Sequence, residues 1–248
     1  MAHALLPLKD LVAAKTRLAG ILSPSERRSL MQAMAQDVLC VLIAQPALVS
    51  VTLVSDDPGA AMLAASYGVS HLPEQPLGCR GLNAVLTAAC DQLSIPPGER
   101  LLVLHADLPF LQASDITLAL GRQQQQGGLL IGTDRERRGS NLLLFEATAR
   151  PLFQFGADSC ARHRDSARSV GMPVQVLQAS GIARDVDQPR DVKELLLNCP
   201  NPNSGLGAAT STLLSEPRLA SRLHMALANL DTATTVSKST QSKEPSRP

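Results

Sequence analysis

An aspartate follows the longest purely aliphatic run of the first half of this chain. Residues 101–104 are Leu-Leu-Val-Leu, and Asp107 stands three positions further on. Four successive aliphatic residues predict a buried parallel strand, and Pro109 forces a turn because it cannot continue a ladder. Asp107 should therefore lie at the carboxyl end of a strand, where open α/β sheets bind ligands. Asp185 and Asp187 form a second acidic cluster, and their spacing puts both on one side of an extended segment.

Two interpretations of these carboxylates are open. Helix capping could explain Asp107, which precedes an expected helix, and also Asp187 or Asp191 before the last expected helix. Two carboxylates on one side of the chain repel each other unless a cation lies between them. Mg²⁺ prefers oxygen ligands and usually shares them with substrate phosphates. The pattern therefore favours a phosphate-handling Mg²⁺ site made of Asp107, Asp185 and Asp187.

A basic loop follows the first expected strand, with Lys9, Lys15 and Arg17 as its cations. Two cations at positions i and i+2 suit a polyphosphate, and Arg can contact it through two nitrogens. The alternative is an ordinary solvated basic loop. The chain has neither a GxGxxG nor a Walker A sequence, which argues against a dehydrogenase or an ordinary kinase.

Two serines stand where an anion site is expected. Ser140 precedes an expected strand, and Ser159 follows Gly156 at the start of an expected helix. Hydroxyls and glycine backbone N–H groups at a helix N-terminus bind anions, although Ser159 could simply be an N-cap. His163 could face the same pocket or be a structural residue of its helix, and His105 is interpreted as a core residue.

Strands that alternate with helices predict a three-layer α/β fold with a mostly parallel sheet. The segment Ser23-Pro24-Ser25-Glu26 is a helix-start signal. Residues 1–198 are interpreted as one domain. Residues 199–248 are rich in Pro, Asn, Ser, Thr and Gly and are expected to be a largely disordered tail, with a transient amphipathic helix over 214–230. The expected strands are 3–8, 49–54, 69–72, 101–104, 128–132, 141–145 and 174–177, and the expected helices are 24–43, 58–67, 81–93, 113–122 and 189–197.

Composition excludes several classes of protein. The net charge is only +1, with no Trp and one Tyr, so a base-stacking nucleic-acid platform is not expected. No segment has the length of a membrane span or the pattern of a signal peptide. The five cysteines are odd in number and widely spaced, which is typical of reduced thiols. We expect a cytoplasmic protein that binds neither nucleic acid nor membranes.

As a set, these motifs resemble the guanylyltransferases that activate a three-carbon phospho-acid in deazaflavin coenzyme (F420-type) biosynthesis. The resemblance covers about residues 4–197. It implies a nucleotidyltransferase fold of glycosyltransferase-A-like type, related to molybdopterin-guanylyl and sugar-nucleotidyl transferases. It further implies GTP as donor, Mg²⁺ as cofactor, and 2-phospho-L-lactate, phosphoenolpyruvate or 3-phospho-D-glycerate as acceptor; a homodimer is compatible with it. The matching motifs are Pro7-Leu8-Lys9, Ala14-Lys15-Thr16-Arg17-Leu18, Leu82-Asn83, Ala106-Asp107-Leu108-Pro109, Gly139-Ser140-Asn141, Phe155-Gly156 with Ser159 and His163, and Asp185-Val186-Asp187.

The resemblance also implies roles for individual residues. Lys15, Arg17 and Asp107 would be catalytic, and Asp107, Asp185 and Asp187 would hold the metal. The sequence departs from the family pattern at Ser140, where Thr is typical, and at His105, where Pro is usual. The nucleotide would be bound by Leu8, Lys9, Lys15, Arg17 and Asn83, and the acceptor by Ser140, Gly156 and Ser159.

The acceptor and two rival functions complete these expectations. In a helix that starts near Asn83, Leu86 and Cys90 share its face, and a thiol beside the pocket favours 3-phospho-D-glycerate with its extra hydroxyl. One rival is a molybdopterin- or sugar-phosphate nucleotidyltransferase, which usually has a glycine-rich first loop that this chain lacks. The other is a non-catalytic nucleotide-binding module, which would tolerate the loss of one acidic cluster, whereas both are present here.

Overall fold

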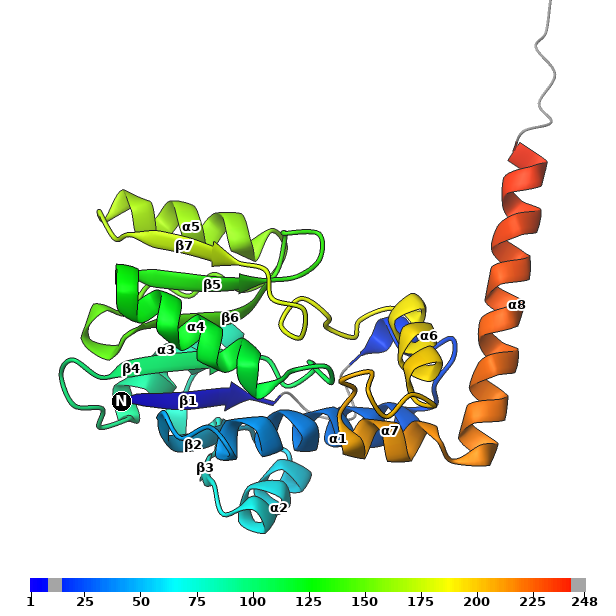
Figure 1. Cartoon of the computed structure of the whole chain (residues 1–248), viewed down its shortest axis with the longest axis horizontal. Helices are drawn as coiled ribbons and strands as arrows, with labels where there is room; N and C mark the ends of the chain where they lie inside the picture. Colours follow the sequence, from blue (N-terminus) through cyan, green and yellow to red (C-terminus); the bar gives the residue numbers. More distant parts are fainter. Residues whose placement is uncertain (9–14, 242–248) are drawn as a thin grey trace, which may run out of the picture.

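The computed structural model describes residues 1–8 and 15–241, so Lys9 lies outside the described residues. A seven-stranded sheet runs through the molecule, with helices on both of its faces (Figure 1). The strands are β1 (Ala2–Pro7), β2 (Leu48–Val54), β3 (Ser70–Leu72), β4 (Arg100–Leu104), β5 (Leu129–Thr133), β6 (Ser140–Glu146) and β7 (Val174–Leu177). The α-helices are α1 (Pro24–Ile43), α2 (Pro58–Tyr67), α3 (Leu82–Gln92), α4 (Ala113–Gln126), α5 (Ser159–Ser169), α6 (Pro189–Asn198), α7 (Ala208–Leu214) and α8 (Pro217–Gln241). Three 3₁₀-helices connect them at η1 (Thr16–Leu18), η2 (Gln75–Leu77) and η3 (Ala147–Ala149).

The strand order is β3-β2-β1-β4-β6-β5-β7. All neighbouring strands pair in parallel except β6, which is antiparallel to both β4 and β5. Because β6 runs backwards, its first residues lie where β4 ends: Leu142 pairs with Leu104, and the His105 N–H donates to the Asn141 carbonyl at 3.0 Å. The antiparallel strand therefore brings Ser140 to the same sheet edge as Asp107.

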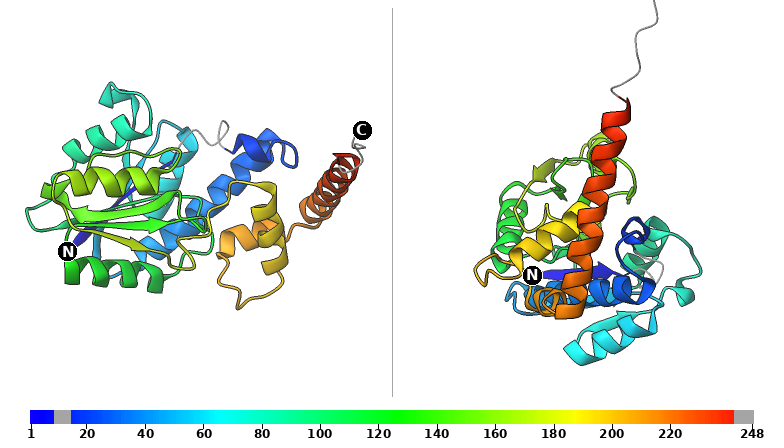
Figure 2. Two further views of the ribbon diagram at one scale, coloured as in Figure 1. Left: turned by 90° about the horizontal axis from the view of Figure 1, so that it is seen from above. Right: turned by 90° about the vertical axis from the view of Figure 1, so that its right-hand side faces the viewer.

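The strands of the sheet separate two hydrophobic cores. On β4, Leu102 and Leu104 pack into one core, whereas Leu101 and Val103 pack into the other. This alternation is what a strand buried on both faces requires. Helices α1, α2 and α4 cover the first core and α3 and α5 the second. Figure 2 shows helices on both faces of the sheet. The three-layer α/β fold with a mostly parallel sheet is thus confirmed.

Helix α1 begins at the predicted start signal. The Glu26 N–H donates to the Ser23 hydroxyl at 3.3 Å, and the Glu26 carboxylate accepts from the Ser23 N–H at 2.7 Å. This reciprocal capping box satisfies two N–H groups that have no partner within the helix. Pro24 follows the cap, where its fixed φ and missing N–H do no harm.

The segment after residue 198 differs from the expected disordered tail, because α7 and the first turns of α8 pack on the domain. The buried Asp37 of α1 accepts the N–H groups of Ala209 and Thr210 at 2.8 and 2.9 Å. Gly207 fits closely there, since a Cβ at this position would lie 2.1 Å from the Asp37 carboxyl carbon. The apolar side of α8 is buried through Leu219, Leu223 and Leu227, as the four-residue spacing of these leucines requires.

Within the described residues, no helix combines the length and the apolar character needed to cross a membrane. Each strand and helix predicted from the apolar patterns is present in the structure. Strand β7 and helices α1 and α2 have the predicted bounds, and most other elements differ from prediction by one or two residues at an end.

Candidate functional site

A cavity of about 910 Å³ opens at the carboxyl ends of β1 and β4. Its size falls within the range of small-molecule sites. Most of the predicted site residues line it, whereas Asn83 does not. The predicted residues that line the cavity are Leu8, Lys15, Arg17, Asp107, Ser140, Gly156, Ser159, Asp185 and Asp187.

Lys15 is the centre of the charged cluster in this cavity. Its ammonium group forms ion pairs with the carboxylates of both Asp107 and Asp187, and only 9% of its side chain is exposed. Arg17 is far more open, with 70% of its side chain exposed and its Nη1 atom 3.9 Å from Asp187 Oδ2. Lys15 has a left-handed backbone with φ of 57°, which is uncommon for a residue with a Cβ. The chain thus adopts a strained turn that aims Lys15 at two acids.

The pKa values in the cluster follow from burial and charge together. Burial alone would lower the pKa of Lys15, but the charges of Asp107 and Asp187 raise it above its ordinary value. Burial likewise tends to raise the pKa of Asp107, but the charge of Lys15 prevails and lowers it. Opposite charges at short range favour both ionised forms. At neutral pH Lys15 is therefore a cation and Asp107 a carboxylate.

Asp185 completes the acidic group. Its carboxylate accepts a hydrogen bond of 3.1 Å from the Asn141 amide, which also donates to the Ile182 carbonyl at 2.9 Å. Burial, followed by the charge of Asp107, raises the pKa of Asp185 to about 7. Asn141 is a residue whose role the sequence reasoning missed, although it lies in a quoted motif. The sequence feature that could have indicated this role is a polar side chain near the start of an otherwise apolar strand.

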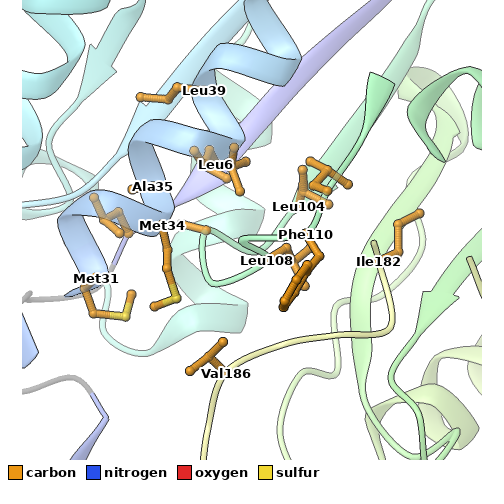
Figure 3. Close-up of a cluster of buried hydrophobic side chains, with 14 of the residues drawn as sticks. Leu6, Met31, Met34, Ala35, Leu39, Leu104, Leu108, Phe110, Ile182 and Val186 are labelled. Atoms are coloured by element: carbon orange, nitrogen blue, oxygen red, sulfur yellow. The ribbon is translucent and has the colours of Figure 1, made fainter. Parts of the chain in front are cut away.

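The core explains why two aspartates separated by one residue both face the cavity. Val186, between them, is 1% exposed and packs in the first core with Met31 and Phe110 (Figure 3). In an extended segment, neighbours of an inward residue point outward. The Val186 N–H also donates to the Asp107 carbonyl at 3.2 Å. The backbone of Val186 therefore holds the two acidic segments together, and its buried side chain orients Asp185 and Asp187 toward the cavity.

The capping alternatives are resolved by the hydrogen bonds. Asp191 caps α6, since its carboxylate accepts the N–H groups of Asp187 and Gln188 at 2.9 and 2.7 Å. Helix α4 begins beyond Asp107, and its capping box consists of Gln112 and Asp115. Asp107 and Asp187 are therefore not helix caps, and their carboxylates are used in the cavity.

The donor set suits a hard divalent cation. Asp107 Oδ1 is buried and has no hydrogen-bond partner among the described residues, so these residues leave one oxygen of the cluster without a donating group. Among the described side chains, no three His, Cys, Asp or Glu residues are grouped closely enough to hold a metal ion as they stand. Lys15 now takes the position of a cation between Asp107 and Asp187.

The two predicted serines lie next to each other in the wall of the same cavity. The Ser140 N–H donates to Ser159 Oγ at 2.9 Å, and Ser140 Oγ lies 3.0 Å from Nδ1 of the buried His163. Ser159 is therefore not an N-cap, because α5 begins at Ser159 and Asp158 takes the cap position. The open question about His163 is also answered in part: it lies behind Ser140 rather than in the cavity lining.

Asn83 does not line the main cavity, although the resemblance implied that it binds the nucleotide. Its amide oxygen accepts the Phe155 N–H at 2.7 Å, and its amide nitrogen donates to the Phe155 carbonyl at 3.2 Å. Both ends of the side chain are thus used to hold the loop before Gly156. With φ of 123°, Gly156 has a backbone conformation that residues with a Cβ rarely adopt.

Cys90 does not lie beside the main cavity either. It lines a second, separate cavity of about 390 Å³ with Asp91 and Arg150. The expectation that its thiol faces the acceptor is therefore wrong. The reason is distance along α3: a side chain two turns beyond the helix start lies far from a ligand at that end.

The neutral state of His163 predicts a pH-dependent stability. Burial lowers its pKa from 6.5 to about 4; a backbone hydrogen bond to Ser159 opposes the shift, and Arg162 and His105 add to it. Below pH 6.5 this histidine binds a proton in the unfolded chain but stays neutral in the folded chain. Its contribution to the free energy of unfolding therefore falls as the pH falls. The loss should be about 2 kcal/mol at pH 5. Because other groups such as Asp185 also titrate in this range, the prediction concerns the difference between two proteins. Between pH 7.5 and 5, urea unfolding should show about 2 kcal/mol more loss of stability in the wild type than in His163→Gln; equal changes in both would contradict it.

Comparison with known proteins adds a relationship by sequence. The family model described as "Guanylyl transferase CofC like" matches residues 2–205. Phosphoenolpyruvate guanylyltransferase of Sphaerobacter thermophilus is 36% identical over 197 residues, covering 79% of this chain and 93% of that protein. A 3-phospho-D-glycerate guanylyltransferase of Phenylobacterium zucineum is 35% identical over 202 residues, covering 79% and 89%.

Solved structures share the fold at low identity. A Desulfovibrio desulfuricans G20 structure described as a nucleotide-diphospho-sugar transferase has a TM-score of 0.71 at 18% identity, over 91% of this chain and 97% of that chain. A 4-diphosphocytidyl-2C-methyl-D-erythritol synthase has a TM-score of 0.55 at 13% identity, over 78% and 96%. The matched model spans most of the chain and the sequence relatives match over most of their length. The chain therefore belongs to the CofC-like guanylyl transferase family.

Proposed function

We propose that the protein is a Mg²⁺-dependent guanylyltransferase that transfers GMP from GTP to the phosphate of a three-carbon phospho-acid. The observation that carries the proposal is the composition of one cavity. Lys15, the carboxylates of Asp107, Asp185 and Asp187, and the two predicted serines all line it. Carboxylates that suit a cation and hydroxyls that suit an anion, in one cavity, fit two phosphorylated substrates that must meet.

The reaction needs charge neutralisation more than it needs a base. An oxygen of the acceptor phosphate attacks the α-phosphorus of GTP, the bond to the β-phosphate oxygen breaks, and pyrophosphate leaves. A phosphate monoester has a second pKa of about 6, so the attacking oxygen is already ionised at neutral pH. The difficulty is that several anions must come together, which cations can relieve.

The residues of the cavity divide this task. Asp107, Asp185 and Asp187 would hold Mg²⁺, which when bound would neutralise charge on the triphosphate and on the leaving pyrophosphate. Lys15 and Arg17 would place positive charge beside the same phosphates. Arg17, with its exposed side chain, can move to a ligand at little cost in lost contacts.

The proposed acceptor is phosphoenolpyruvate or 3-phospho-D-glycerate. Relatives of nearly equal identity carry one or the other acid in their names, so overall identity does not favour either. The structural reason for preferring 3-phospho-D-glycerate was Cys90, which lines the other cavity. Both acids have a carboxylate and a phosphate that Ser140 and Ser159 could bind. The family relationship supports deazaflavin coenzyme biosynthesis as the proposed pathway of the product.

The decisive measurement is pyrophosphate release. Purified protein with GTP and Mg²⁺ should release pyrophosphate when phosphoenolpyruvate or 3-phospho-D-glycerate is added, and at most about 1% of that rate without an acid, because the attacking oxygen is missing. Parallel assays with 2-phospho-L-lactate complete the set of acceptors. ATP in place of GTP tests the choice of base, and excess chelator tests the metal.

The outcomes separate the rival functions. Release with none of the three acids would refute the proposed transfer, and release with a sugar phosphate instead would favour a sugar-phosphate nucleotidyltransferase. Tight GTP binding without turnover would favour the non-catalytic module. Full activity in the presence of excess chelator would refute the part of the proposal that concerns Mg²⁺.

A further inference from the structure

The buried ring of His163 has a defined tautomer. Its Nε2 atom lies 2.8 Å from the backbone nitrogen of Gln154, which donates to it. A backbone N–H can only donate, so Nε2 must be the acceptor and carries no proton. His163 is completely buried, and its depressed pKa agrees with a neutral ring. The single ring proton therefore belongs to Nδ1.

This tautomer sets the direction of the next hydrogen bond. Nδ1 lies 3.0 Å from Ser140 Oγ, and since Nδ1 carries the proton, His163 donates and the serine hydroxyl accepts. Ser140 cannot give its own proton to His163.

The hydroxyl proton of Ser140 must therefore point elsewhere. Ser140 lines the main cavity. Among the described residues, the only hydrogen-bond partner of its hydroxyl is His163, which donates, so the hydroxyl proton has no acceptor there. Ser159 is in the same situation, because its oxygen accepts the Ser140 N–H at 2.9 Å and it also lines the cavity. Both oxygens are occupied by protein donors, so both protons are available to a ligand.

We infer that His163 is a positioning residue that fixes the Ser140 hydroxyl as a hydrogen-bond donor toward an anionic group of the acceptor. The inference rests on the proposed function for the identity of that acceptor. A protonated Nδ1 cannot take a proton from Ser140, so the pair is neither a nucleophile nor its base. A site that offers only donors favours a carboxylate or phosphate and disfavours an ester or amide, whose own groups would be left unpaired.

Two substitutions of His163 separate positioning from packing. In His163→Asn, the amide nitrogen occupies the place of Nδ1 and can still donate to Ser140, but the acceptor for the Gln154 N–H is lost. In His163→Gln, the amide oxygen can reach the place of Nε2 and accept from Gln154, but the donor to Ser140 is lost. Each variant thus keeps one of the two hydrogen bonds.

The inference predicts that acceptor binding follows the bond to Ser140. His163→Gln should raise the KM for the acceptor about 5- to 10-fold, as the loss of one hydrogen bond suggests, with kcat and the KM for GTP within about twofold. His163→Asn should keep the acceptor KM within about twofold of the wild type, even where its urea midpoint is lower. The midpoints of both variants are measured beside the kinetics.

A purely structural role gives a different pattern. The inference would be overturned if the acceptor KM rose in both variants in proportion to their loss of stability. It would also be overturned if the acceptor KM rose in neither variant. An increase only in His163→Asn would overturn it as well, since it would assign the important bond to Gln154. If a variant fails to fold, the inference is tested by a measurement on the wild-type protein.

The tautomer can be measured directly in that protein. Nitrogen-15 NMR of the histidine rings distinguishes a protonated from an unprotonated nitrogen, and His163 is assigned by its absence in His163→Gln or, should neither variant fold, by sequential assignment. A proton on Nδ1 supports the inference, and a proton on Nε2 overturns it. This readout needs no turnover, so it stands apart from the failure of the proposed function, which would appear as no pyrophosphate release with any acid.

Discussion

Asp107→Asn is expected to reduce pyrophosphate release by roughly 10³-fold while leaving the fold intact, because the change removes a charge that the site needs at the reacting phosphates. Asparagine has nearly the same shape and can still accept a hydrogen bond from Lys15. The substitution replaces one of the two carboxylate oxygens by an amide nitrogen, and one of these oxygens is the buried Oδ1, which has no partner among the described residues. The measurement is the steady-state rate with saturating GTP and acid.

A matched control distinguishes the site from a general effect of charge. Asp91→Asn also removes one carboxylate that forms an ion pair, here with Arg150, but it lies at the second cavity. Its rate should stay within about twofold of the wild type, as expected for an exposed ion pair. Thermal unfolding of both variants tests the fold. A near-normal rate for Asp107→Asn would show that this carboxylate takes no part in the reaction.

Lys15→Met should have two opposite effects, which makes it the second large prediction. Turnover should fall about 10²- to 10³-fold because a cation beside the phosphates is lost. Binding of Mn²⁺ without nucleotide should become about 10-fold tighter, because Asp107 and Asp187 lose the internal cation that competes for their oxygens. Mn²⁺ suits the same carboxylate ligands as Mg²⁺ and can be followed by electron paramagnetic resonance.

The exposed Lys193 provides the control for the loss of a positive charge. Lys193→Met should leave both turnover and Mn²⁺ binding within about twofold, because screened charges at the surface contribute little. Weaker Mn²⁺ binding in Lys15→Met would contradict competition between the ammonium group and a metal. Unchanged turnover would contradict the assignment of Lys15 to the phosphates.

Much of the charged half of the site could be predicted from the sequence. An apolar strand followed by Asp107, and an acidic pair separated by one residue, have local patterns that carry their own geometry. The pairing of Lys15 with both acidic segments could not be predicted, since the partners are 92 and 172 positions apart. Nor does a local pattern show that β6 runs antiparallel, which is what brings Ser140 to the same edge.

The expectations that differ from the structure share a cause. Asn83 and Cys90 were assigned to ligands because of motif position or helical face, without knowledge of what lies opposite each side chain. The segment after 198 was judged by its polar composition, while the four-residue spacing of Leu219, Leu223 and Leu227 already indicated a buried helix side. Its docking also depends on Asp37, which no pattern within the segment itself could reveal.

The seating of α7 on Asp37 has a practical consequence for where the chain can be shortened. A protein ending at residue 198 would leave that buried carboxylate without two of its hydrogen bonds and would uncover apolar surface of α1 beneath α7 and of α6 beneath α8. The minimal folding unit therefore reaches into α8. Because α8 leads away from the sheet (Figure 1), an affinity label is better attached beyond this helix than in place of it.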